Sequence, residues 1–350
     1  MSAILCIWNR MGDYHRARIR ALGAKAEKVI TADLGQSDKL YQWESGEEKD
    51  HYVLSEKGID HSDLLGRFSN FRRIVKKEGV SVVGLAGYGR SEYLLFMIYA
   101  RLKGIHVILF SESWYSRGGL IDWLKGALIR MLANRYFASG ERAMQHLESK
   151  LSIKKESIST GYSVVDNDHF RNEFPEYASN ILLCMARFSP EKNLSMLLNA
   201  FSESKLSSNW KLCLVGGGPQ KKELEQLAKQ LGNIEIQNWV AYHSLPEWYG
   251  KASAFILPST FEPWGLVVNE AMAASLPVWV SEQSGCVPDL VDESNGRVFD
   301  ANDKNSIVES LNWLAGLTES ELQMMGERSA EKIKDYSTAT WADKFMAMTR

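Results

Sequence analysis

Two basic residues follow a short apolar run at a spacing that could bind an anion. Residues 181–185 are predicted to form a β-strand, and Arg187 and Lys192 come after it on either side of a Ser-Pro-Glu helix start. Ligands of open parallel sheets bind beyond the carboxyl ends of the strands, so both cations could point into a binding crevice. A single Arg or Lys is usually a solvated charge, but two at this position favour an anion site.

Two carboxylates flank a second candidate site. Glu262 follows the apolar run 254–258, Gly265 begins the next helix, and Glu270 lies in the second turn of that helix. The free N–H groups and the positive dipole at the helix start suit a diphosphate. Glu270 could accept hydrogen bonds from vicinal hydroxyls. The alternative, in which Glu262 only caps the helix and Glu270 is a surface acid, stays open.

A glycine-rich loop follows another predicted strand, at residues 210–215. Gly216, Gly217 and Gly218 would let the backbone approach a ligand closely. The loop is similar to the dinucleotide fingerprint G-x-G-x-x-G, but Lys221 stands where the third glycine is needed. This mismatch argues against an NAD-linked oxidoreductase. A tight structural turn and a ligand contact are both open for the loop.

These residues depend on the elements that position them. Short apolar runs alternate with longer amphipathic stretches, which is typical of repeated βα units and a parallel sheet. The sequence therefore predicts an α/β fold. Strands are expected at 3–8, 28–32, 80–86, 105–110, 135–138, 180–185, 210–215, 233–237, 254–258, 277–281 and 297–299, and helices at 14–22, 63–78, 91–103, 119–134, 140–150, 191–204, 219–231, 244–251, 264–275, 303–316, 320–335 and 337–349.

At 350 residues the chain exceeds what one hydrophobic core usually serves. We expect an N-terminal Rossmann-like domain at 1–165, a C-terminal one at 166–336, and a final helix at 337–350 that packs back on the first domain. The turn-rich stretch 161–179 is the predicted linker, and a cleft is expected there. The polar segment 36–62 is predicted to be a loop that could cover an acceptor.

Composition narrows the class of protein. The net charge is −2, and no apolar run approaches the length of a membrane span. The apolar start reads as a first strand rather than a signal peptide, so a cytoplasmic location is expected. Four widely separated cysteines, Cys6, Cys184, Cys213 and Cys286, form no metal-binding spacing and are expected to be buried thiols.

The charge is unevenly distributed along the chain. Residues 1–165 carry 25 Lys and Arg against 18 Asp and Glu, whereas residues 166–350 carry 16 against 25. A basic half suits an anionic partner such as a phosphorylated lipid or a membrane surface, although chance asymmetry of solvated faces explains it equally well. Residues 117–135 mix basic and large apolar side chains and could lie on a membrane or pack in the core.

Taken together, these motifs resemble the family 4 retaining glycosyltransferases, also described as glycosyl transferases group 1. The resemblance covers most of the chain and is strongest in the C-terminal half. It implies the GT-B fold, in which two Rossmann-like domains face each other across a central cleft. Arg187 and Lys192 resemble the cations that neutralise the donor diphosphate, and Glu262 to Glu270 resembles the Glu-x7-Glu motif of the family.

The resemblance also implies roles for individual residues. Glu262 would contact the transferred sugar and Glu270 the nucleotide ribose. The backbone at Gly265, Leu266 and Val267 would contact the sugar and phosphates. Trp239 and Val240 are similar to the family loop that contacts the base. Apart from the resemblance, the position of Gly216 and Gly217 after a predicted strand makes them candidate donor contacts as well.

Two departures from the family concern the N-terminal half. The loop around Gly12, a residue that is expected to contact the donor, has one glycine where the family has two. Many members carry a catalytic-site His after the fourth N-terminal strand, whereas this chain reads Ser111-Glu112-Ser113 there. Glu112 is the expected substitute for that His.

The resemblance implies transfer of a sugar from a UDP- or GDP-sugar to an acceptor hydroxyl, with retention of configuration. No prosthetic group, metal or nucleic acid is expected, and the D-x-D sequence 166–168 is interpreted as part of the linker. The acceptor is expected to be a glycan or a lipid-linked glycan in polysaccharide biosynthesis. A peripheral contact of the protein with the inner face of an anionic membrane stays open. The alternatives are a catalytically silent glycan- or lipid-binding GT-B protein, and a sugar-nucleotide epimerase or phosphorylase.

Overall fold

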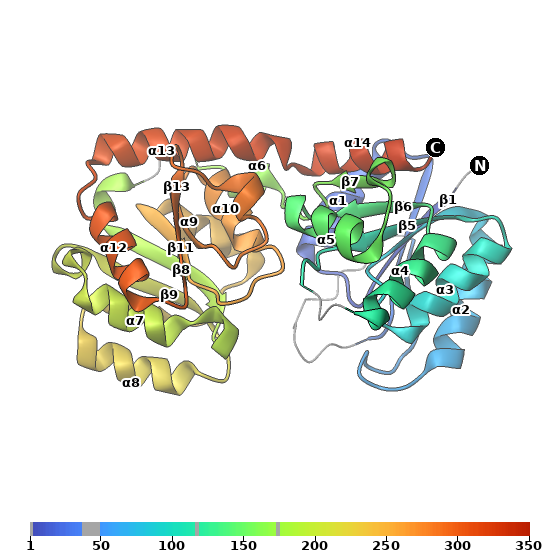
Figure 1. Cartoon of the computed structure of the whole chain (residues 1–350), viewed down its shortest axis with the longest axis horizontal. Helices are drawn as coiled ribbons and strands as arrows, with labels where there is room; N and C mark the ends of the chain where they lie inside the picture. Colours follow the sequence, from blue (N-terminus) through green and yellow to red (C-terminus); the bar gives the residue numbers. More distant parts are fainter. Residues whose placement is uncertain (1–2, 37–49, 116–118, 173–175) are drawn as a thin grey trace. The chain divides into compact units, whose positions relative to one another are not determined.

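A computed structural model describes residues 3–36, 50–115, 119–172 and 176–350 (Figure 1). The chain divides into two compact units, which are described separately below. Unit 1 contains Met1–Val164 and Thr338–Arg350, and unit 2 contains Val165–Ser337. Part of the predicted loop 36–62, Arg117 of the predicted amphipathic stretch, and Pro175 of the predicted linker lie outside the described residues.

Unit 1 is built on a seven-stranded parallel sheet of order β3-β2-β1-β4-β5-β6-β7. Its central strands are apolar and almost completely buried, because helices cover both faces of a parallel sheet. The strands are β1 (Ala3–Trp8), β2 (Lys28–Asp33), β3 (His51–Val53), β4 (Val80–Leu85), β5 (His106–Ser111), β6 (Arg135–Ala138) and β7 (Ile158–Thr160). The helices are α1 (Asp13–Gly23), α2 (Leu64–Glu78), α3 (Ser91–Leu102), α4 (Leu120–Leu132), α5 (Glu141–Leu151) and α14 (Thr338–Met348).

Unit 2 has a six-stranded parallel sheet of order β10-β9-β8-β11-β12-β13. The strands are β8 (Ile181–Arg187), β9 (Lys211–Gly217), β10 (Ile234–Gln237), β11 (Ala254–Leu257), β12 (Val278–Ser281) and β13 (Gly296–Phe299). The helices are α6 (Asn167–Phe170), α7 (Leu194–Glu203), α8 (Lys221–Leu231), α9 (Leu245–Gly250), α10 (Leu266–Ala273), α11 (Val287–Leu290), α12 (Lys304–Leu314) and α13 (Glu319–Lys332). Its strand order brings the ends of β8, β9 and β11 next to one another.

The final helix α14 belongs to unit 1 although it follows unit 2 in the sequence. It packs along α1, and Trp341 and Phe345 are both completely buried. The two rings stack with centroids 5.2 Å apart, and Phe110 of β5 lies within 6.4 Å of both. Buried aromatic pairs of this kind add stability beyond the area that they bury.

The two Rossmann-like parallel sheets confirm the predicted α/β class. The prediction of a loop for 36–62 is wrong at His51–Val53, which forms β3 and pairs with β2 through Thr31. This strand has only three residues, none of them buried, so it lacks the apolar run that marks the other strands. The pairing with β2, and not the local sequence, makes it a strand.

Among the described residues, no helix is long and apolar enough to cross a membrane.

Candidate functional site

The carboxyl end of the unit 2 sheet gathers the predicted anion-binding residues. Strands β8 and β11 are neighbours, so the segments that follow them meet at this edge. The backbone N–H of Thr260 donates a 2.9 Å hydrogen bond to the carbonyl of Glu191, which ties the two segments together. The Nζ of Lys192 donates to the carboxylate of Glu262, and both side chains are largely buried. Two residues predicted separately from sequence therefore form one ion pair.

A short 3-10 turn, Pro190–Lys192, places Lys192 at this edge. The turn ends at Asn193, whose backbone is left-handed with φ of 56°. The Asn193 side chain donates a 2.7 Å hydrogen bond to the carbonyl of Ala301. Asn tolerates the left-handed region better than most residues, so Asn193 both makes the turn and anchors it to the neighbouring loop.

The charges of Arg187 and Lys192 act on a common neighbour, Glu191. Burial opposes ionisation of the Glu191 carboxyl, but the hydrogen bond from Ser189 and the two nearby cations outweigh it, so its pKa is lowered. Arg187 ends β8 and is partly buried. Its guanidinium makes no hydrogen bond or ion pair with any residue in the described part of the chain.

The start of α10 follows Glu262, the acidic member of this ion pair, by a few residues in the sequence. Gly265 is its N-cap, in a left-handed conformation with φ of 103°, and as a glycine it has no side chain that could cap the helix. Leu266 and Val267 form the first turn and are partly exposed. A helix start of this kind presents N–H groups and positive charge to an anion.

Trp264 fixes this helix start in place. Its indole is buried, its Nε1 donates a 2.8 Å hydrogen bond to Asn269, and its ring stacks on Tyr336 at 5.7 Å. The preceding loop is held by Glu262, whose carbonyl accepts a 2.9 Å hydrogen bond from the N–H of Gly285. The loops after β11 and β12 are thus joined, and the orientation of Glu262 is set by both.

Glu270 is only 1% exposed, so the alternative of a surface acid is wrong. The hydroxyl of Tyr249, on α9, donates a 2.5 Å hydrogen bond to its carboxylate. Burying a carboxylate is costly unless it is hydrogen-bonded. Sequence reasoning missed Tyr249, because nothing in the α9 sequence distinguishes it from an ordinary core aromatic.

The glycine-rich segment has a clear packing role, and the prediction that it is a loop is wrong for Gly216 and Gly217, which are the last two residues of β9. A Cβ atom on Gly216 would lie 1.9 Å from the carbonyl oxygen of Ala186 on β8, and its φ is 154°. A Cβ atom on Gly217 would lie 2.8 Å from the indole of Trp239. Trp239 is 64% exposed and is followed by the partly buried Val240. The structure therefore places the indole of Trp239 directly against Gly217.

Replacing Gly216 by Ala is expected to destabilise the protein by about 1–3 kcal/mol, because the added Cβ atom would strain the backbone and push β9 away from β8. The free energy of unfolding, measured by denaturant titration, checks this. Gly23→Ala is the matched control, since nothing lies within 4 Å of a Cβ atom there. Equal stability of the two variants would contradict the packing role.

Gly12 and Glu112, the two site residues predicted in unit 1, follow the carboxyl ends of β1 and β5. Gly12 follows β1 and is the N-cap of α1, with φ of −117°, a conformation that any residue can adopt. Its N–H donates a 3.0 Å hydrogen bond to Nδ1 of His15. Burial, with the charges of Arg18 and Arg16, holds the pKa of His15 well below its usual value, so the ring is neutral and can accept this bond.

Glu112 follows β5 and is exposed. Its carboxylate accepts a 2.7 Å hydrogen bond from the hydroxyl of Ser163. The structure therefore brings Arg187, Lys192, Glu262, Gly265 and the glycines at the end of β9 together within unit 2, and it places Gly12 and Glu112 in the other unit.

Within the described residues, no group of three or more His, Cys, Asp or Glu side chains is arranged to hold a metal ion. In the D-x-D sequence, Asp168 is 86% exposed and lies 3.5 Å from Arg171.

The family described as Glycosyl transferases group 1 matches residues 165–332, the segment that contains the site in unit 2. An uncharacterized glycosyltransferase of Methanocaldococcus jannaschii is 33% identical over 119 residues, which are 33% of this chain and 30% of that protein. The lipopolysaccharide 1,6-galactosyltransferase of Escherichia coli is 24% identical over 265 residues, 71% of this chain and 70% of that protein.

Among solved structures, the chain is similar to Anabaena Alr3699/HepE in complex with UDP. The TM-score is 0.78 at 13% identity, over 99% of both chains, so the likeness is one of fold. The chain spans less than half the length of the first relatives that it matches, between 30% and 48%.

Proposed function

Residues 165–332 belong to the glycosyl transferases group 1 family, in a chain with the GT-B fold, and from this premise we propose that the protein transfers a sugar from a nucleoside diphosphate sugar to an acceptor hydroxyl. The observation that carries the proposal is the convergence of Arg187, Lys192, Glu262 and the α10 start at one sheet edge. HepE, a protein of the same fold, was solved with UDP. The donor is a UDP- or GDP-sugar.

The main chemical task is to stabilise the departing diphosphate. Negative charge grows on its oxygens as the glycosidic bond breaks. Arg187, Lys192 and the N–H groups of Leu266 and Val267 would meet that charge with groups already in position. Each group would contribute on the order of 2–4 kcal/mol at the transition state. This arrangement supplies positive charge without a metal ion, so the reaction would be metal-independent.

In this proposal Glu262 and Glu270 contact different parts of the donor. Glu262 would contact the transferred sugar, and its ion pair with Lys192 holds the carboxylate next to the diphosphate position. Glu270 would accept hydrogen bonds from the ribose hydroxyls. Trp239, whose indole lies against Gly217, and Val240 would contact the base.

The proposed mechanism retains the anomeric configuration. The leaving diphosphate oxygens would take the acceptor proton on the same face of the sugar, so no strong base is required. Unit 1 would bind the acceptor, a glycan or a lipid-linked glycan. Glu112 would be a catalytic residue, and Gly12 would contact the donor. A place in polysaccharide or lipid-linked glycan assembly, at the cytoplasmic face of an anionic membrane, fits the basic charge of residues 1–165. An NMR spectrum of the product that shows the opposite anomer would contradict retention.

Added UDP or GDP is expected to raise the melting temperature, because a ligand that binds only the folded protein stabilises it by mass action. At about 100 times Kd the stabilisation is about 2.7 kcal/mol. The shift should persist in EDTA and should be much smaller in Arg187→Ala. A thermal-shift panel of nucleoside diphosphates and their sugars measures this and also identifies the base. Equal shifts in the wild type and Arg187→Ala would exclude Arg187 from the site.

A further inference from the structure

Helices α3 and α4 of unit 1 lie side by side (Figure 1). Both helices expose large apolar side chains to solvent. On α4, Trp123 is 56% exposed, Leu124 53% and Met131 64%; on α3, Ile98 is 37% exposed and Leu102 79%. We call these five residues the α3–α4 surface. Single exposed apolar residues are common on proteins, but a group on two neighbouring helices marks an interaction site.

The helical spacing on α4 shows that its exposed apolar residues do not face the core of unit 1. On α4, Gly126, Ile129 and Leu132 are buried and form the face that packs inward. Leu124 and Met131 lie on the opposite face, two turns apart, with Trp123 beside them. A surface helix normally carries polar residues on its outer face. The outer face of α4 is apolar instead.

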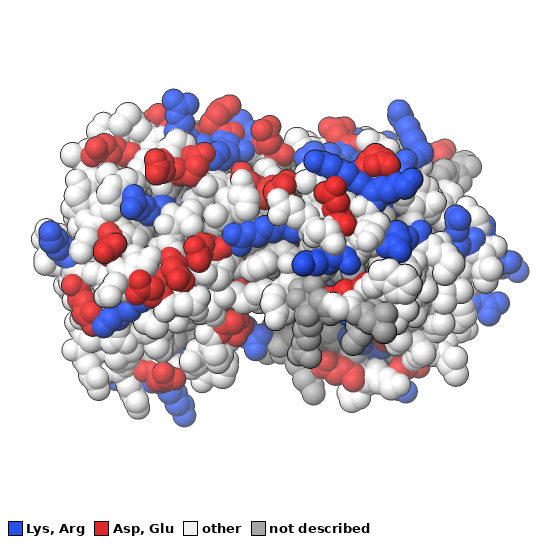
Figure 2. Space-filling view, in the orientation of Figure 1, with Lys and Arg blue, Asp and Glu red and all other residues white. Residues whose placement is uncertain are grey.

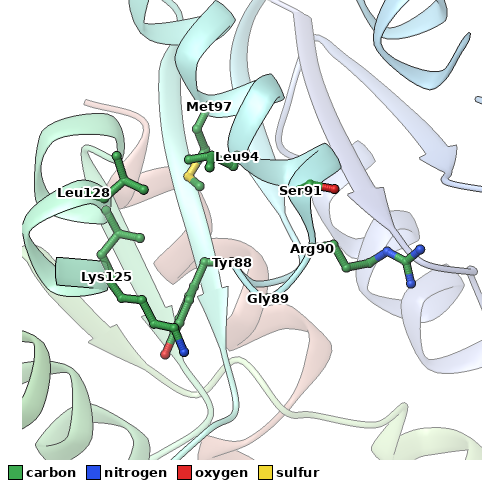
Figure 3. Close-up of a pocket in the computed structure, with 9 residues that line it drawn as sticks. Tyr88, Gly89, Arg90, Ser91, Leu94, Met97, Lys125 and Leu128 are labelled. Atoms are coloured by element: carbon green, nitrogen blue, oxygen red, sulfur yellow. The ribbon is translucent and has the colours of Figure 1, made fainter. Parts of the chain in front are cut away.

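A pocket of about 210 Å³ extends this apolar surface between the two helices. Figure 3 shows Leu94 and Met97 of α3 facing Leu128 of α4, with Tyr88 and Lys125 at the border. Leu128 is one turn from Leu124, and Leu94 is one turn from Ile98, so both walls of the pocket continue onto the α3–α4 surface.

The charges beside this surface have one sign. Arg101 on α3, and Lys125 and Arg130 on α4, are exposed. The acidic residues of the two helices, Glu92 and Asp122, are 6% and 9% exposed, and Glu92 is ion-paired with the buried Arg67. Every exposed charged side chain described on α3 and α4 is therefore basic. The space-filling view shows predominantly uncharged side chains over α4 with Lys and Arg close by (Figure 2).

We propose that the α3–α4 surface docks on an anionic lipid bilayer. Apolar side chains that include Trp, surrounded by Lys and Arg, are the composition of helices that lie in a membrane interface. The apolar residues would enter the acyl boundary, while Arg101, Lys125 and Arg130 would contact lipid phosphates. This inference deepens the proposed function: it identifies the surface that would bring the acceptor-binding unit to a lipid-linked substrate.

Vesicle co-sedimentation of the whole chain, without donor or acceptor, tests the docking. The wild type is expected to bind vesicles that contain phosphatidylglycerol and to bind pure phosphatidylcholine at least about tenfold more weakly. Raising the salt from about 0.1 M to about 1 M shortens the Debye length from about 10 Å to about 3 Å and should weaken the binding. Binding to neither vesicle, or equally to both, would overturn the proposal.

Two variants separate the apolar and basic contributions. The triple variant Trp123→Ser, Leu124→Ser, Met131→Ser should lose at least about tenfold in vesicle affinity, and Lys125→Glu, Arg130→Glu should lose the preference for phosphatidylglycerol. Met324→Ser is the matched control, because Met324 is 55% exposed on α13 in unit 2. Loss of binding in the control alone, or in no variant, would contradict the assigned surface.

The rise in melting temperature that UDP causes, measured without vesicles, distinguishes failure of the docking proposal from failure of the proposed sugar transfer. The triple variant should retain the wild-type shift, since its changes lie in unit 1 and the donor site lies in unit 2. Vesicle binding without a nucleotide response would contradict sugar transfer but leave the docking surface in place. If instead a protein partner covers the surface, vesicle binding will be absent and the proposal will fail.

Discussion

Replacing Lys192 by Ala is expected to lower kcat for sugar transfer about 10²–10³-fold, a loss of roughly 2.7–4 kcal/mol of transition-state stabilisation. Lys192 lies at the end of the 3-10 turn, where its ammonium group meets Glu262 beside the α10 start. The ammonium group would be needed most when charge develops on the diphosphate, so the loss should appear in kcat more than in KM. Steady-state kinetics with the donor identified by thermal shift measures both.

The control for this variant is Lys251→Ala. Lys251 also pairs with a glutamate, Glu247, at 2.5 Å, but both side chains are more than half exposed. Surface ion pairs contribute about 0–1 kcal/mol to stability, so both transfer and folding should be nearly unchanged. Lys192→Arg should restore part of the lost rate because it keeps the charge. Near-normal turnover in Lys192→Ala would contradict its catalytic role.

Replacing Glu270 by Ala is expected to reduce both donor use and stability. The loss of hydrogen bonds from the ribose to a charged acceptor should lower kcat/KM about 10²-fold, at about 1.5–3 kcal/mol for each such bond. The same change removes the acceptor of the Tyr249 hydroxyl, which is expected to cost about 1–3 kcal/mol of folding free energy. Kinetics and a denaturant titration measure the two losses.

Two further variants separate the structural role of Glu270 from its role in binding. Glu270→Gln keeps an acceptor for Tyr249 but removes the charge, so KM for the donor should rise with little change in melting temperature. Tyr249→Phe should lower the melting temperature and leave KM close to normal. If Glu270→Gln binds the donor as well as the wild type does, Glu270 is a structural residue that supports α9 and α10.

Strands could be predicted from the sequence where they are apolar and continuous. Strands β1 and β6 have the predicted bounds, because all but one of their residues are buried and the runs end at polar residues. β3 was missed because only its pairing with β2 defines it. Strand order is a tertiary property, so the sequence could not say that β8 lies between β9 and β11.

The site shows the same limit. Arg187, Lys192 and Glu262 could be found because functional residues follow strand ends in parallel sheets. The ion pair between Lys192 and Glu262 joins residues 70 positions apart and depends on β8 and β11 being neighbours. The burial of Glu270 depends on α9, whose Tyr249 carries no recognisable signal. Local spacing thus identifies candidate side chains, while strand order and packing decide which of them meet.

The place of α14 also bears on the order in which the chain folds during synthesis. Unit 1 requires Trp341 and Phe345, yet the ribosome makes all of unit 2 before it reaches them. At about 5–20 residues per second, the nascent residues 1–164 wait on the order of ten seconds for this helix. During that interval the apolar side chains of α1 and β5 that α14 later covers, among them Phe110, remain available to chaperones or to aggregation. Unit 2 is continuous in the sequence and is complete before unit 1 is.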